Sequence, residues 1–303
     1  MKLDPQIAAW MARLNPEQHF ETAHRQFWRL AHTFERDAPE MHETRTIDVE
    51  GADETLKARL YTPRAAGVSG PGLIFFHGGA FVVGDLDSHE MMCRRLAHAA
   101  RMRVLSVAYR LSPKHRFPCA VDDVIAATRW TAQHGAEFGM DAARLAVGGD
   151  SAGGNLAAVV TQQIRGSDLR LRGQLLIYPS TQWVEMTPSQ MRLRQGYVLT
   201  QAVQDYFKDK YLRTREDGLD VRASPLLAED FTGLPPAYII TGGYDPLRDE
   251  GKAYADKLAA FGVPVVYREY SDQPHGFFSL TAISRVAKQA IEDAGVWLAK
   301  TLA

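Results

Sequence analysis

Cysteine, excess charge and long apolar runs are all scarce in this sequence. Only two of its 303 residues are cysteines, Cys93 and Cys119, which is too few for the disulfide framework of a small secreted protein. A single bridge between them is open, but we expect two unpaired, buried thiols in a reducing, cytoplasmic compartment. The apolar residues near the N-terminus are interrupted by Arg13, Glu17 and His19, so no signal peptide is expected either.

The sequence also lacks the features that attract nucleic acid or membranes. No uncharged apolar run reaches the ~18 residues that a transmembrane helix needs. Lys and Arg total 35 against 36 Asp and Glu, a net charge of -1, which gives no field to gather nucleic acid or an anionic membrane surface. We therefore predict neither partner, while a monomer and a homodimer are both compatible with the sequence.

What is present is the composition of an ordinary globular protein, with 46% hydrophobic and 23% charged residues. Apolar residues recur at helical spacing in two stripes between residues 5 and 35, which predicts two amphipathic helices. The stripes consist of Ile7, Trp10, Met11 and Leu14, and of Phe20, Phe27, Leu30 and Phe34. Alternation at 47–49 and 56–60 then predicts an antiparallel hairpin.

From residue 72 onward, short apolar runs alternate with helical segments. Continuous apolar runs suit strands covered on both faces, and helices between them suit the crossovers of a parallel sheet. The runs lie at 72–76, 104–109, 145–148, 174–178, 237–241 and 265–270, and helical segments at 118–134, 152–165 and 249–261. With the hairpin, they predict an α/β fold with an eight-stranded, mostly parallel sheet between helices. The stretch between Tyr178 and Pro236 has no strand run and is interpreted as a partly helical insertion.

Residues 149–153 read G-D-S-A-G, the G-x-S-x-G pattern, between a predicted strand and a predicted helix. This setting predicts a nucleophile elbow, in which Ser151 stands exposed on a sharp turn and the glycines relieve crowding between strand and helix. An N-capping serine or a phosphate-binding loop is the alternative.

A second small-residue turn, H-G-G-A-F at 77–81, also follows a predicted strand. Small residues allow backbone N–H groups to turn toward a developing oxyanion, as acyl transfer requires. The candidate donors are the N–H groups of Gly78, Gly79, Ala80 and Ala152. A turn that only lets strand and helix pack would explain the two glycines equally well.

A serine nucleophile needs a base, and the base needs a carboxylate that orients it. Asp245 follows the predicted strand at 237–241, and His275, the only histidine beyond Asp245, follows the last predicted strand. The order Ser, Asp, His is one in which such triads occur. Asp249 and Asp272 are competing carboxylates, for which a helix cap and a turn are the simpler roles.

No metal is predicted, because no spacing of histidines and cysteines matches a zinc signature. A mechanism based on a serine triad requires no organic cofactor either. Phe81 beside the second turn, with Tyr197 and Phe207 of the insertion, are the candidates for a substrate-binding acyl pocket. Ordinary packing of the insertion on the core is the alternative for these aromatic residues.

Five stretches of the sequence resemble the bacterial hormone-sensitive-lipase-like esterases, family IV of the α/β-hydrolases. They are residues 77–85 (HGGAFVVGD), 109–123 (YRLSPKHRFPCAVDD), 149–155 (GDSAGGN), 245–251 (DPLRDEG) and 275–277 (HGF). The resemblance implies an α/β-hydrolase catalytic domain over residues 45–303. It also implies a cap over the active site, formed by N-terminal helices in residues 1–44 and by an insertion at about 181–222.

The resemblance further implies that Ser151 is the nucleophile, that Asp245 and His275 complete the triad, and that the turn at 77–80 forms the oxyanion hole with Ala152. Ala80 departs from the third glycine usual in the family. The expected activity is hydrolysis of short- to medium-chain carboxylic esters of small molecules through an acyl-enzyme. An amidase or deacetylase acting on a small acylated metabolite would use the same residues. A non-catalytic small-molecule receptor on this fold would lack part of the triad, which this sequence retains.

Overall fold

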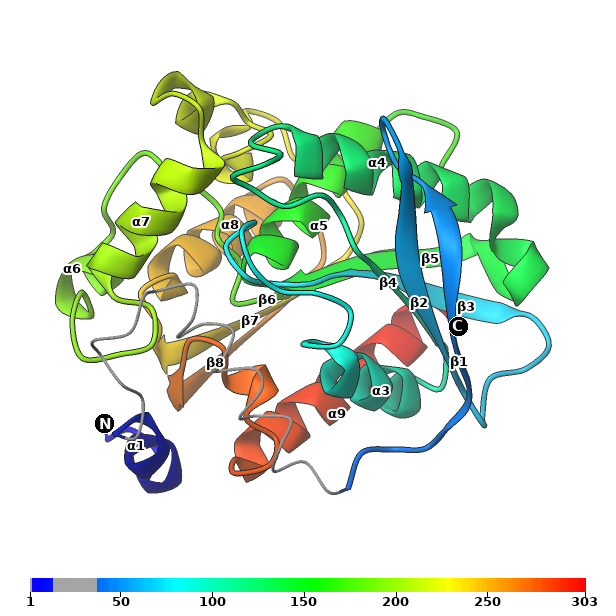
Figure 1. Cartoon of the computed structure of the whole chain (residues 1–303), viewed down its shortest axis with the longest axis horizontal. Coiled ribbons are helices and arrows are strands. Elements are labelled where there is room, and N and C mark those ends of the chain that lie inside the picture. The colour runs from blue at the N-terminus through cyan, green and yellow to red at the C-terminus, as the bar shows by residue number, and fades with distance from the viewer. Residues whose placement is uncertain (1, 13–36) are drawn as a thin grey trace.

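The computed structural model describes residues 2–12 and 37–303 (Figure 1). The second predicted N-terminal helix, with its apolar stripe from Phe20 to Phe34, lies outside the described residues. The first forms helix α1 (Pro5–Met11). Asp4 caps its N-terminus, because Oδ1 of Asp4 accepts a hydrogen bond of 2.8 Å from the N–H of Gln6. Such side-chain caps satisfy N–H groups that have no partner within the helix.

The described chain forms one eight-stranded sheet with the order β1-β2-β4-β3-β5-β6-β7-β8. The hairpin strands β1 and β2 pair antiparallel with each other, β2 also pairs antiparallel with β4, and the other neighbours are parallel. The prediction of the sheet is thereby confirmed. The strands are β1 (Met41–Glu50), β2 (Thr55–Pro63), β3 (Gly70–Phe76), β4 (Arg103–Val107), β5 (Met140–Asp150), β6 (Gly173–Ile177), β7 (Ala237–Tyr244) and β8 (Val265–Pro274).

Helices cover both faces of the sheet and bury its apolar runs (Figure 1). The helices α4 (Cys119–His134), α5 (Ala152–Ile164) and α8 (Arg248–Ala260) pack on one face. The helices α3 (Glu90–Ala100) and α9 (Arg285–Thr301) pack together on the other. Leu73 and Ile74 are successive residues of β3, fully buried in the two different cores. This is why the strand is a continuous apolar run rather than an alternating one.

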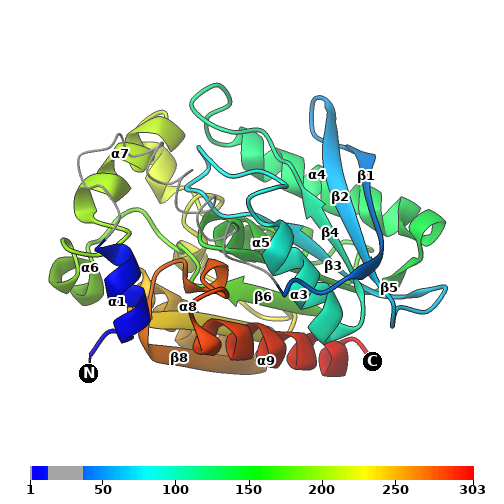
Figure 2. The same cartoon turned by 60° about the horizontal axis from the view of Figure 1, so that its bottom comes forward.

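The predicted insertion contains two short helices, α6 (Pro188–Arg192) and α7 (Gln201–Tyr211). With α1 they gather at one end of the molecule, on the left in Figures 1 and 2. Four 3-10 turns complete the helical structure of the described residues. They are Gly135–Phe138, Glu216–Leu219, Pro225–Leu227 and Phe277–Ser279.

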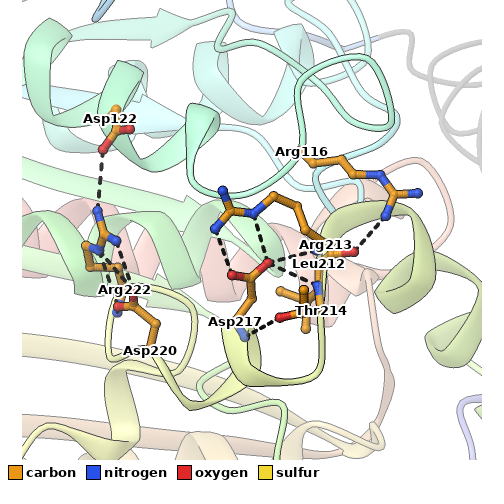
Figure 3. Close-up of polar contacts among 8 residues, drawn as sticks. All are labelled: Arg116, Asp122, Leu212, Arg213, Thr214, Asp217, Asp220 and Arg222. Atoms are coloured by element: carbon orange, nitrogen blue, oxygen red, sulfur yellow. Dashed lines mark hydrogen bonds and ion pairs between the residues drawn. The ribbon is translucent and has the colours of Figure 1, made fainter.

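The loop after α7 is fastened to the core by arginines (Figure 3). Arg116 donates a hydrogen bond of 2.8 Å to the carbonyl oxygen of Leu212. Arg222 lies 3.9 Å from Asp122 of α4, and its guanidinium also sits over the ring of Phe117. The insertion is therefore tied to the parallel-sheet domain where the chain leaves α7.

Both cysteines are unpaired; Cys93 is buried as predicted, whereas Cys119, the first residue of α4, is partly exposed. No helix in the described ranges has the length and apolar character needed to cross a membrane.

Candidate active site

Ser151 occupies the sharp turn between β5, which ends at Asp150, and α5, which begins at Ala152. Its φ of 55° and ψ of -115° lie in a region of backbone conformation that residues other than glycine rarely adopt, as expected of a nucleophile elbow. A Cβ on Gly153 would collide with the carbonyl group of Phe76 in β3. The Ser151 hydroxyl makes no capping hydrogen bond to α5, which argues against the alternative of a simple N-cap.

The three residues predicted for the triad meet at the carboxyl end of the sheet. His275 Nε2 lies 3.0 Å from Ser151 Oγ, and His275 Nδ1 lies 2.9 Å from Asp245 Oδ2. Asp245 is fully buried, and its Oδ1 accepts a hydrogen bond of 2.8 Å from the N–H of Leu247. The carboxylate is thus held on one side by the backbone and faces the imidazole with the other.

The competing carboxylates lie elsewhere. Asp249 is in the first turn of α8 and accepts a hydrogen bond of 2.7 Å from the N–H of Ser189 in α6. Asp272 was expected in a turn, but it lies in the extended end of β8. Its carbonyl oxygen there accepts a hydrogen bond of 3.1 Å from the N–H of Asp4. Neither carboxylate takes part in the contacts of His275.

The turn at 77–81 lies beside Ser151, but one of its predicted donors is occupied. The N–H of Gly78 donates a hydrogen bond of 2.8 Å to Asp150 Oδ1, so Gly78 must be removed from the predicted donor set. The N–H groups of Gly79, Ala80 and Ala152 have no acceptor among the described residues. Gly79 has a φ of 121° and Ala80 a φ of 53°, and these positive angles turn the chain sharply at this point.

A buried polar cluster that the sequence analysis missed supports this turn. Asp150, His77 and His89 are each at most 2% exposed, and His89 Nε2 lies 3.2 Å from Asp150 Oδ1. Burial lowers the pKa of His77 to about 4, and the neighbouring His89 adds to the shift, so this imidazole is neutral at ordinary pH. Asp150, the D of the G-D-S-A-G motif, was the one sign of this cluster in the sequence. Nothing in the sequence indicated that His89 would be its partner.

A cavity of about 50 Å³ opens beside Ser151 and is partly lined by the insertion. Of the three aromatic residues named above, Phe81 and Phe207 line this cavity, whereas Tyr197 does not and instead packs against Tyr244, with ring centroids 5.4 Å apart. The lining residues that sequence reasoning missed include an aromatic side chain, aliphatic side chains and amides. They are Trp183, Leu199, Leu247, Gln182, Gln190 and Gln204.

Glu250 of α8 is a second missed group, only 1% exposed. Its Oε1 accepts a hydrogen bond of 2.7 Å from the N–H of Thr181, and its Oε2 lies 3.3 Å from Nε2 of Gln190. Burial raises the pKa of Glu250 to about 8, and the charge of Asp245 contributes to this shift. The side chain thus links α8 to the base of the insertion.

No group of three or more His, Cys, Asp or Glu side chains in residues 2–12 and 37–303 is arranged to hold a metal ion.

Residues 73–279 match the family model described as the alpha/beta hydrolase fold. The carboxylic ester hydrolase LipN of Mycobacterium tuberculosis is 43% identical over 251 residues, which span 80% of this chain and 66% of LipN. An ethyl acetate hydrolase of Pseudomonas putida is 39% identical over 78% of this chain and 76% of the relative. The solved structure of EH1AB1, an ester hydrolase from the metagenome of Lake Arreo, is 40% identical with a TM-score of 0.92, covering 98% of each chain.

Proposed function

The chain belongs to the hormone-sensitive-lipase-like carboxylesterases of the α/β-hydrolase fold, and on this premise we propose that Ser151, His275 and Asp245 carry out its ester hydrolysis. The observation that carries the proposal is the pair of contacts made by His275. Its Nε2 lies 3.0 Å from Ser151 Oγ while its Nδ1 lies 2.9 Å from Asp245. One imidazole can therefore take a proton from the serine while the carboxylate stabilises the resulting charge.

In the proposed reaction, Ser151 Oγ attacks the ester carbonyl carbon as His275 Nε2 removes its proton. The tetrahedral intermediate collapses when His275 returns that proton to the departing alcohol, which leaves an acyl-enzyme. Water then attacks the acyl carbonyl by the same sequence of proton transfers, and the carboxylic acid is released.

The proposed oxyanion hole consists of the N–H groups of Gly79, Ala80 and Ala152. Their lack of other acceptors among the described residues supports this assignment. Ala152 is also the first residue of α5, so its N–H has no partner within the helix. Donors that are already oriented stabilise the transition-state oxyanion without any reorganisation during the reaction.

The proposed acyl pocket is short. It is the cavity of about 50 Å³ beside Ser151, with Phe81 and Phe207 among its walls. A volume of this size supports a preference for short acyl groups, and the similarity to an ethyl acetate hydrolase points the same way. The proposed substrate is accordingly a small ester with a short- to medium-chain acyl group.

We also propose that residues 1–44, which include α1, and the insertion act together as a cap. Ile7 and Trp10 of α1 share an apolar cluster with Val82 and Val83, which follow the oxyanion turn, and with Phe207 of α7. This contact supports a cap that shapes the pocket and excludes water without supplying a catalytic group.

We further propose a reducing, cytoplasmic location for the protein. The two unpaired cysteines support this location.

The triad is tested by exposing the protein to a p-nitrophenyl alkylphosphonate and locating the label by peptide mass spectrometry. We expect a stoichiometric adduct on Ser151 and loss of p-nitrophenyl butyrate hydrolysis by ~10³-fold or more in Ser151→Ala. Ser167→Ala, in a surface loop, is the matched control and should keep its activity. Labelling of another serine, or near-normal turnover by Ser151→Ala, would contradict the proposal.

A further inference from the structure

Two buried hydrogen-bond donors beside the proposed nucleophile have no acceptor in the part of the chain that the structure describes. Trp183 Nε1 and Gln204 Nε2 are both buried and unpartnered among the described residues. Both residues line the cavity next to Ser151. Buried polar groups in proteins are nearly always hydrogen-bonded, so two unpartnered donors on residues that line this cavity are unusual and leave an acceptor to be supplied by the ligand.

The orientation of the Gln204 amide follows from its neighbours. The N–H of Thr187 donates a hydrogen bond of 2.8 Å to Gln190 Oε1, so the other end of the Gln190 amide must be its NH₂ group. That Nε2 lies 3.1 Å from Gln204 Oε1. Gln204 therefore accepts with its oxygen, and its own NH₂ group is left to donate.

The remaining amide of the cavity wall is not available in this way. Gln182 Oε1 accepts hydrogen bonds of 2.7 Å from the N–H groups of both Val184 and Glu185. Its Nε2 donates a bond of 2.6 Å to the carbonyl oxygen of Glu185. Gln182 thus holds its own loop together, whereas Trp183 and Gln204 each keep a buried donor that has no acceptor among the described residues.

The chemistry of the wall limits what the acceptor can be. No Lys or Arg is among the described residues that line this cavity, so nothing there neutralises a carboxylate. The rest of the wall is largely apolar, with Phe81, Leu199, Phe207 and Leu247. A ligand acyl chain that is apolar except for one neutral oxygen matches this wall of apolar side chains and uncharged donors.

We propose that this cavity selects acyl groups with an ether or ketone oxygen beyond the ester carbonyl, bound by the N–H groups of Trp183 and Gln204. The inference rests on the proposed function, because it takes the cavity beside Ser151 as the acyl pocket. A purely aliphatic acyl group fills the same space but leaves both donors unpaired. A site built to hydrogen-bond its substrate discriminates against the analogue that lacks the partner.

The test compares p-nitrophenyl esters that differ only by replacement of a CH₂ group with oxygen. Ethoxyacetate and 3-methoxypropanoate are each compared with pentanoate, and every kcat/KM is divided by the rate of hydroxide hydrolysis to remove intrinsic reactivity. We expect at least one oxygen-containing ester to be preferred by about tenfold, which is the effect of roughly one buried hydrogen bond.

Trp183→Phe and Gln204→Met remove one donor each while keeping an aromatic ring at position 183 and the length of the side chain at position 204. Each should lower the oxygen-to-carbon ratio severalfold, with circular dichroism confirming the fold. Trp130→Phe on α4 and Gln289→Met on α9 are matched controls that should leave the ratio unchanged. If Trp183→Phe does not fold, Gln204→Met and the wild-type ratio still decide the question.

A wild-type ratio of one or less, or a ratio that neither variant alters, would overturn the inference while the esterase mechanism stands. Failure to hydrolyse any ester, pentanoate included, would overturn the proposed mechanism as well.

Discussion

Asp150 accepts a hydrogen bond of 2.8 Å from the N–H of Gly78, although the two residues lie 72 positions apart in the chain. The contact joins the residue before Ser151 to the turn that carries the proposed oxyanion donors. Burial by itself raises the pKa of Asp150, but His89 and the N–H of Gly78 outweigh it and hold this pKa below its ordinary value. Asp150 is therefore a buried anion that fixes the geometry of the turn.

Loss of this anion should impair catalysis more than substrate binding. We expect Asp150→Ala to lower kcat by about 10- to 100-fold with a much smaller change in KM, because displaced oxyanion donors weaken transition-state stabilisation. Steady-state kinetics with p-nitrophenyl butyrate measure both constants. Asp141→Ala, near the start of the same strand, is the control. A raised KM with unchanged kcat would show that Asp150 acts on substrate binding instead.

Asp245 and Asp249 lie only four positions apart, but their replacement by asparagine should affect kcat very differently. Asp245→Asn removes the charge that stabilises the His275 imidazolium and should lower kcat by ~10³- to 10⁴-fold. Asp249→Asn should keep kcat within about twofold, because Asp249 tethers the N–H of Ser189 rather than the base. The two variants are compared in one kinetic assay. A reversed order would reassign the triad carboxylate.

Glu250 should make stability depend on pH. Its pKa is raised from 4.5 to about 8, so between these values the folded protein keeps a proton that the unfolded chain releases. Wild-type stability therefore falls as pH rises through this window. Glu250→Gln cannot titrate, and its free energy of unfolding relative to wild type should rise by roughly 2–5 kcal/mol from pH 5 to pH 8.

Urea denaturation at the two pH values measures this difference for Glu250→Gln. Glu292→Gln, an exposed residue of α9, serves as the control and should show no such trend. A pH-independent difference for Glu250→Gln would mean that the buried carboxyl group ionises at its ordinary pH.

Ala80 stands where the family usually has a glycine, and its φ is 53°. An alanine in this left-handed region is strained, so Ala80→Gly should raise the free energy of unfolding by about 1 kcal/mol. Ala202→Gly, on an exposed helical position, should lower it by about 1 kcal/mol. Chemical denaturation of both variants measures which effect is larger at position 80, the relief of backbone strain in the folded state or the added entropy of glycine in the unfolded chain. A loss of stability in both would contradict the strain.

The cap is tested through Trp10, which is 7% exposed and packs with Val82 and Val83. Trp10→Ala should destabilise the protein by about 3 kcal/mol and also shift the acyl-chain preference, because the oxyanion turn loses its cover. Trp297→Ala removes a ring packed 5.5 Å from that of Tyr238 on another part of the sheet. Trp297→Ala is the control, and it should lower the stability without changing the acyl-chain preference. The same unaltered profile in Trp10→Ala would leave α1 a purely stabilising role.

The eight strands of the sheet and the three residues proposed for the triad could be predicted from the sequence because they depend on local physics. A continuous apolar run indicates a strand buried on both faces, and the glycines around Ser151 reflect crowding that any strand-to-helix elbow creates. The carboxyl ends of parallel strands share one edge of the sheet, so residues that follow such strands converge there whatever their spacing in the chain. Asp245 and His275 were identified as triad candidates in this way.

Other features of the site were decided only by tertiary contacts. The sequence contained Gly78 as a candidate donor, but whether its N–H is available depends on Asp150, a distant residue whose side chain reaches it. Aromatic residues in the insertion were recognisable, yet the packing of α6 and α7 on the core placed Trp183 at the cavity and Tyr197 against Tyr244. Backbone patterns repeat with fixed periods and can be read locally. Side-chain partners are set by which surfaces meet in three dimensions, and no period in the sequence records that.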